Sequence, residues 1–174
     1  MEECSISRLK SVLERLANRP IGGFGRSWVG AKPSGEATLI AAIASKVGLD
    51  ARGRETDFQA VAICDAPVWL TLFATQSLLH GERPIPVGLL DEVTESLAAL
   101  GNEAKFFSKG IWQQTRRMKH YEMVRFDSGW SQSRHRLIFQ GSEGPLSPID
   151  VLEDGGIIGF GENAAFVFWT EEDD

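Results

Sequence analysis

The spacing of apolar residues predicts four helices in the first 102 residues. Apolar positions recur every three or four residues there, the period of an α-helix. The third of these segments is apolar on nearly all sides, so we expect it to be the central buried helix. A short apolar run, Phe58–Ile63, predicts one strand between the second and third helices. The predicted helices span residues 5–18, 36–47, 67–79 and a segment from Pro86 to Gly101.

Beyond Asn102 the pattern changes to short runs typical of strands, joined by turn-forming residues. The order of elements predicts an α+β protein, with a helical N-terminal half packed on a mostly antiparallel sheet formed largely by the C-terminal half. We expect one domain over residues 1–170 and an acidic tail at 171–174. The four predicted strands are His120–Phe126, Arg136–Gln140, Gly156–Phe160 and Ala164–Trp169.

Composition fits a globular domain, with 174 residues of which 43% are hydrophobic and 24% charged. The N-terminus is acidic and shows no signal-peptide pattern. The most apolar stretch, Ala60–Leu79, is interrupted by Asp65 and Pro67, so we expect no membrane span and a cytoplasmic location. The chain has two cysteines, which predict neither a disulfide framework nor a zinc site.

Charge is divided along the chain more strongly than its net value of −6 indicates. Residues 105–136 hold eight basic and two acidic side chains. Residues 150–174 hold eight acidic side chains and no Lys or Arg. The chain is therefore electrically segmented, and each segment needs its own functional interpretation.

A glycine-rich segment at 22–35 invites comparison with phosphate-binding loops, because it precedes a predicted helix N-terminus. The P-loop spacing fails: one residue separates Gly30 from Lys32, and Pro33 stands where a hydroxyl residue is required. We favour a turn-rich connection here. A phosphate-handling enzyme built on this segment stays as an alternative.

Cys64 is a candidate nucleophile, because a helix N-terminus directly after it would favour a thiolate. The neighbouring Asp65 would oppose that effect, and the apolar surroundings favour a buried structural cysteine. A catalytic cysteine also needs a histidine partner, and nothing in the sequence marks one of His80, His120 and His135 for that role.

The basic segment at 112–136 combines cationic side chains with aromatic rings, a combination that binds RNA in other proteins. The acidic isoelectric point, near 5.1, argues against that function. The acidic C-terminal strands would also neutralise these cations within the same sheet. RNA binding through residues 112–136 stays as a second alternative.

The acidic C-terminal segment suits a cationic protein partner, because carboxylates around exposed aromatic anchors give steered association and a hydrophobic contact. The plainer interpretation is a solvated turn followed by a core strand with Phe166 and Phe168 inward. We expect no metal and no cofactor, since no calcium-loop or carboxylate–histidine pattern accompanies the acids. The predicted partner-binding residues are Asp150, Glu153, Asp154, Glu162, Trp169, Glu171, Glu172 and Trp130.

In size, acidity and lack of catalytic motifs, the chain resembles the small cytosolic immunity proteins that bacteria pair with toxins. That resemblance implies a non-enzymatic inhibitor that neutralises or escorts a basic protein, for example within a toxin–antitoxin pair. The sequence thus favours a binding protein over an enzyme. The competing hypotheses are a small cytosolic enzyme that uses Cys64 or the 22–35 segment, and an RNA-binding protein.

Overall fold

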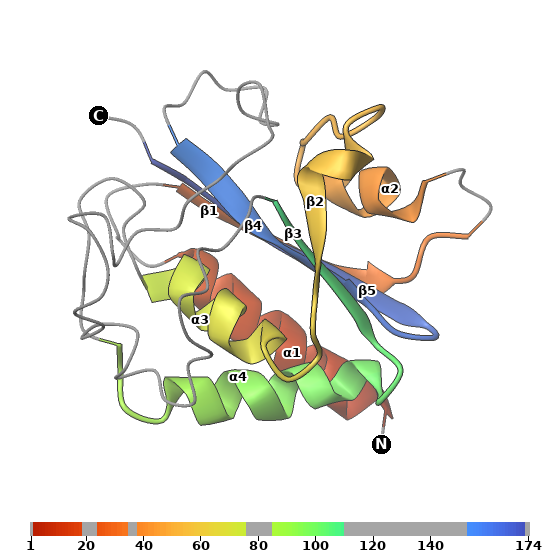
Figure 1. The fold of residues 1–174 in the computed structure, drawn as a ribbon. Coiled ribbons are helices and arrows are strands. Elements are labelled where there is room, and N and C mark those ends of the chain that lie inside the picture. The colour runs from red at the N-terminus through yellow and green to blue at the C-terminus, as the bar shows by residue number, and fades with distance from the viewer. Residues whose placement is uncertain (1, 19–23, 35–37, 76–84, 110–152, 173–174) are drawn as a thin grey trace.

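The computed structural model describes residues 2–18, 24–34, 38–75, 85–109 and 153–172 (Figure 1). Its helices are α1 (Glu2–Ala17), α2 (Leu39–Ser45), α3 (Ala66–Thr75) and α4 (Leu89–Leu97), with 3-10 turns at Glu55–Asp57 and Ala98–Leu100. Its strands are β1 (Phe24–Ala31), β2 (Phe58–Val61), β3 (Lys105–Lys109), β4 (Glu153–Phe160) and β5 (Ala164–Glu172).

The five described strands form one sheet in the order β1-β5-β4-β3-β2, and every neighbouring pair is antiparallel. Strands β4 and β5 form a hairpin whose connection is Gly161-Glu162-Asn163. Strand β1, from the N-terminal part of the chain, pairs along its whole length with β5. The predicted α+β class and antiparallel sheet are confirmed.

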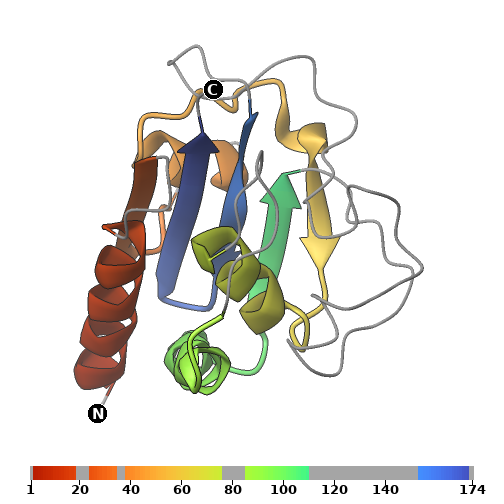
Figure 2. The ribbon, with the colours of Figure 1, turned by 90° about the vertical axis from the view of Figure 1, so that its left-hand side faces the viewer.

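Helices cover both faces of the sheet, as Figures 1 and 2 show: α1, α3 and α4 lie on one face and α2 on the other. Side chains of β5 alternate between two hydrophobic clusters. Phe166 and Phe168 join the cluster of the three helices, while Val167 and Trp169 join the cluster under α2. Residues from Ala165 to Trp169 are at most 1% exposed, so β5 is buried on both faces.

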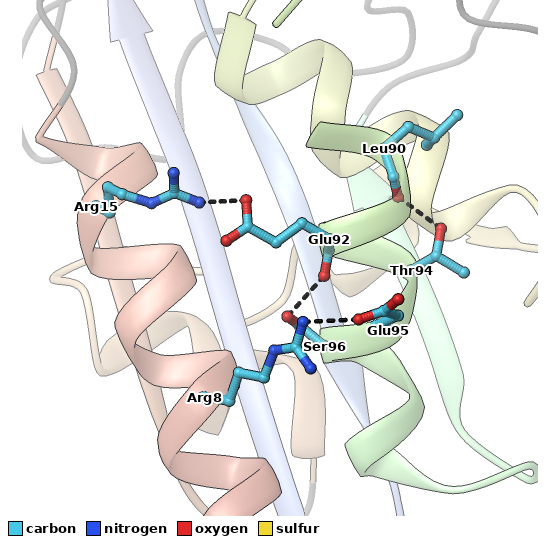
Figure 3. A network of polar contacts seen from close by, with 7 residues as sticks. All are labelled: Arg8, Arg15, Leu90, Glu92, Thr94, Glu95 and Ser96. Atoms are coloured by element: carbon cyan, nitrogen blue, oxygen red, sulfur yellow. Dashed lines mark hydrogen bonds and ion pairs between the residues drawn. The ribbon is translucent and has the colours of Figure 1, made fainter. Parts of the chain in front are cut away.

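Helices α1 and α4 are joined on their outer side by two ion pairs (Figure 3). Arg8 Nη2 lies 2.7 Å from Glu95 Oε2, and Arg15 pairs with Glu92 one helical turn closer to the α4 N-terminus. Exposed pairs of this kind contribute about 0–1 kcal/mol each. Buried residues such as Leu13, which is 0% exposed, therefore hold α1 in place more than the ion pairs do.

The helical predictions are confirmed in position, with ends shifted by a few residues. The predicted 36–47 helix is shorter in the structure, at Leu39–Ser45, and α1 starts earlier than residue 5. The strands predicted at 58–63, 156–160 and 164–169 are also confirmed. Those predicted at 120–126 and 136–140 lie outside the described residues. In the described part of the chain, no helix is both long and apolar enough to span a bilayer.

The glycine-rich segment was predicted to be a loop, and that prediction is wrong over Phe24–Ala31, which is β1. The glycines serve close packing within the strand. A Cβ on Gly25 would lie 2.5 Å from the carbonyl oxygen of Ala17, and a Cβ on Gly30 would lie 2.5 Å from the Trp28 ring. A glycine that admits a neighbouring group inside a strand has the same sequence signature as a turn glycine.

Two further elements differ from the prediction. Strand β3 was not predicted at all. The expected tail from residue 171 was wrong at its start, because Glu171 and Glu172 belong to β5 and pair with β4. The sheet therefore extends further toward the C-terminus than the apolar residues alone indicated.

Candidate functional site at the acidic end of the β4–β5 hairpin

Strand register brings four acidic residues together where β4 begins and β5 ends. Glu153 pairs with Glu172, and Asp154 pairs with Glu171. We call these four residues the acidic strand end. Like charges directly opposite each other on neighbouring strands repel and destabilise the pairing. The register therefore sets acidic residues opposite each other at this end of the hairpin.

Of the remaining predicted partner-binding residues, the structure describes Glu162 and Trp169. Glu162 lies in the exposed turn between β4 and β5, at the far end of the same hairpin. Asp150 and Trp130 lie outside the described residues. Four of the predicted acids thus form one group, and Glu162 is separate from it.

Glu171 is the one member of the acidic strand end whose side-chain contacts are described. Its side chain is 0% exposed, and its Oε2 atom accepts a hydrogen bond from Arg26 Nη2 at 2.8 Å. Arg26 also donates from Nη1 to the carbonyl oxygen of Val47, just after α2, at 3.0 Å. Arg26 therefore ties β1, β5 and the α2 segment together, a role that the sequence analysis did not predict.

The second oxygen of Glu171, Oε1, is buried and has no hydrogen-bond partner among the described residues. A buried acceptor that gains no hydrogen bond costs about 1–3 kcal/mol, and more for a charged group. Arg26 thus compensates Glu171 only in part. Because its side chain is 0% exposed, Glu171 is an internal carboxylate, and its prediction as a surface contact residue was wrong.

Trp169 is 0% exposed, so its prediction as an exposed anchor was also wrong. Its ring lies over Gly156 of β4, where a Cβ would approach the ring carbon Cε3 to 2.6 Å. The ring centroid is 6.1 Å from that of Phe58, and the Lys109 ammonium lies 5.7 Å from the ring. Trp169 packs into the core under α2, because strand alternation directs it there and the opposite glycine leaves room.

A second cationic residue, Lys109, is buried in the same region and is 2% exposed. Strand register explains why Lys109 lies near Trp169. Lys109 ends β3 opposite Phe58 of β2, and the ring of Phe58 lies beside that of Trp169. An ammonium above an aromatic face is stabilised by the ring quadrupole. The described interior behind the acidic strand end thus contains two cations, one carboxylate and a tryptophan. Glu171, Trp169 and Lys109 have almost no contact with solvent, and Arg26 is partly exposed.

Cys64, the candidate nucleophile, lies on the surface in the segment before α3, so the expectation that it is buried was wrong. Its sulfur lies 3.6 Å from a carboxylate oxygen of Asp65. The three histidines lie outside the described residues. Within those residues, no group of three or more His, Cys, Asp or Glu side chains could hold a metal ion.

The other enzyme alternative required a phosphate-binding loop at 22–35. Phe24–Ala31 is instead a strand hydrogen-bonded to β5, so its backbone does not form such a loop. The basic segment at 112–136 lies outside the described residues, and RNA binding stays a prediction.

The acidic strand end is defined by the strand register and by the contacts of Arg26 and Glu171. Comparison with protein-family models, curated proteins and solved structures found no match.

Proposed function

We propose that this protein is a non-enzymatic binding protein whose acidic strand end meets a positively charged protein partner. A toxin and its immunity protein are the kind of pair that such a surface would serve. The observation that carries the proposal is the register of the hairpin, which sets Glu153 opposite Glu172 and Asp154 opposite Glu171.

The energetic argument starts from the repulsion between these pairs. Cross-strand charge pairs contribute roughly 0.2–1 kcal/mol each, and the sign is unfavourable for like charges. Arg26 neutralises one carboxylate of the four and leaves an oxygen of Glu171 without a hydrogen bond. Cationic side chains of a partner would remove the remaining repulsion on binding, and the net charge of −6 would steer the approach.

The burial of Trp169 and Glu171 changes the roles that we assign. These two residues support the strand end from the interior, together with Arg26. We assign the contact with the partner to Glu153, Asp154 and Glu172. A hydrophobic anchor is not part of the proposal, because Trp169 is buried and Trp130 lies outside the described residues.

The proposal includes a cytoplasmic location. Cys4 and Cys64 are both free and exposed, a state that reducing compartments maintain. Fractionation of the source cells with an antibody to the protein tests this point, and recovery from an oxidising compartment would contradict it.

The test compares three versions of the full-length protein as bait in source-cell lysate at low salt. One is the wild type, and one carries Glu153→Gln, Asp154→Asn and Glu172→Gln. The control removes the same number of charges from exposed residues elsewhere, by Asp91→Asn, Glu103→Gln and Glu162→Gln. The fold of each variant is checked by circular dichroism and urea unfolding.

We expect the wild type and the control to capture the same basic protein, and the strand-end variant to lose it. With the captured protein purified, affinity should weaken steeply between about 50 and about 300 mM sodium chloride, since exposed charges are screened over this range. The strand-end variant should mainly slow association. Equal capture by both variants, or an affinity that salt leaves unchanged, would refute the proposal.

A further inference from the structure

Strand β1 is an edge of the sheet, and its outer side pairs with no described strand. Figure 2 shows it as the outermost strand on the left of the sheet. It is eight residues long, contains neither proline nor lysine, and pairs with β5 over its full length. Such an edge presents a row of backbone N–H and C=O groups that an extended chain can pair with.

The opposite edge of the sheet, β2, is a weaker template. It has four residues, half the length of β1, so it offers half as many backbone groups. The sequence of β1 contains one positive charge, and in the structure that charge is paired. Its only charged residue, Arg26, is paired with Glu171, so the edge does not repel a positively charged chain.

The charge next to β1 selects the kind of chain that would bind. Strand β5 is its neighbour, and the first residue of β1, Phe24, pairs with Glu171. A chain added outside β1 would therefore run past the acidic strand end. Glu172, the next residue of β5 and a member of the acidic strand end, follows Glu171 at that end. Basic side chains would be attracted there, and acidic ones repelled.

We propose that β1 is the docking edge for a basic, extended segment of the partner, which adds a strand to the sheet. The inference rests on the proposed function, because the acidic strand end supplies the attraction. It goes further by naming the backbone of β1 as the contact and an extended conformation as the shape of the ligand. Backbone hydrogen bonds would supply affinity, and the carboxylates would select basic side chains.

The test titrates full-length, nitrogen-15-labelled protein with a synthetic peptide of alternating lysine and valine. The control peptide alternates glutamate and valine and has the same length. We expect the lysine peptide to shift the amide signals of residues 25–31 and to slow hydrogen exchange at alternate β1 amides by about tenfold or more, because those amides gain hydrogen bonds. The glutamate peptide should change neither.

Three results would overturn the inference. Signals could shift at Glu153, Asp154 and Glu172 alone, which would leave the proposed function intact and remove β1 from it. The lysine peptide could fail to shift either region at millimolar concentration. The free protein could be a dimer whose β1 amides are already protected from exchange, which would mean that a second copy occupies the edge.

Discussion

Replacing Arg26 by methionine should destabilise the protein more than replacing its ion-pair partner, Glu171, by glutamine. The two side chains meet at 2.8 Å but differ in their surroundings. Glu171 is 0% exposed, and Arg26 is its hydrogen-bond partner in the described structure. Arg26 is 23% exposed and has a second acceptor, the carbonyl oxygen of Val47. Loss of Arg26 therefore isolates a buried charge, whereas loss of the Glu171 charge leaves a cation that keeps other contacts.

The magnitude follows from this difference. Breaking a buried ion pair by removing one partner costs about 3–5 kcal/mol, because the remaining charge stays uncompensated. We expect Arg26→Met to fall in that range. Glu171→Gln keeps an acceptor of the same shape and loses the charge, so we expect about 1–2 kcal/mol. The double variant Arg26→Met/Glu171→Met should be more stable than Arg26→Met alone, since no buried charge remains.

Urea unfolding followed by tryptophan fluorescence measures these free energies, and thermal unfolding provides a second readout. For a chain of this length about 1 kcal/mol corresponds to a shift of about 2–4 °C in Tm, so Arg26→Met should lower Tm by roughly 6–20 °C. Arg8→Met is the matched control, because its pair with Glu95 is exposed and its loss should cost at most about 1 kcal/mol. If Glu171→Gln costs as much as Arg26→Met, or the double variant is no more stable than Arg26→Met alone, the reasoning is refuted.

Three further predictions concern local geometry. Gly156→Ala should cost about 1–3 kcal/mol in urea unfolding, since its Cβ would approach the carbonyl oxygen of Phe168 to 2.1 Å. Cys64, exposed before α3, should react with a thiol reagent in the folded protein, measured in a variant that lacks the other cysteine. The pKa of Asp50 lies below its ordinary value because Arg52 donates side-chain and backbone hydrogen bonds to the carboxylate. Any stability from this pair is present above the unfolded-state pKa and is lost as pH falls through the folded-state pKa; a carbon-13 NMR titration should show Arg52→Gln raising the Asp50 midpoint.

Several of the elements that the sequence predicted have one dominant period or clear turn residues. Helices α1 and α4 repeat their apolar residues at helical spacing, and the turn residues at 161–163 marked the hairpin. Strand β3 shows no such period. Its adjacent Phe106 and Phe107 are both apolar because Phe106 packs in the helical cluster and Phe107 against the cluster under α2. Two covered faces remove the alternation that identifies a strand, and β3 is too short to show instead the longer apolar run by which β5 was predicted.

The candidate site was also predictable only in part. Once the β4–β5 hairpin is predicted, its register places the acids at the start of β4 opposite the acids at the end of β5. The burial of Trp169 and Glu171 was not predictable, because it depends on α2 and on Arg26 from β1. These elements lie far from β5 in the sequence, and no local pattern links them.

Burial of β5 on both faces restricts where this sheet can meet another molecule. A partner cannot contact the central residues of β5, since helices cover both sides, so contacts must come from strand ends, turns or the outer strands. The acidic strand end and the edge of β1 both satisfy that condition, and they are adjacent because β1 pairs with β5. The interior residues Arg26, Glu171 and Trp169 should then govern stability, while the charges of Glu153, Asp154 and Glu172 should govern association. Substitutions in the first group that changed affinity without changing stability would show that this separation is wrong.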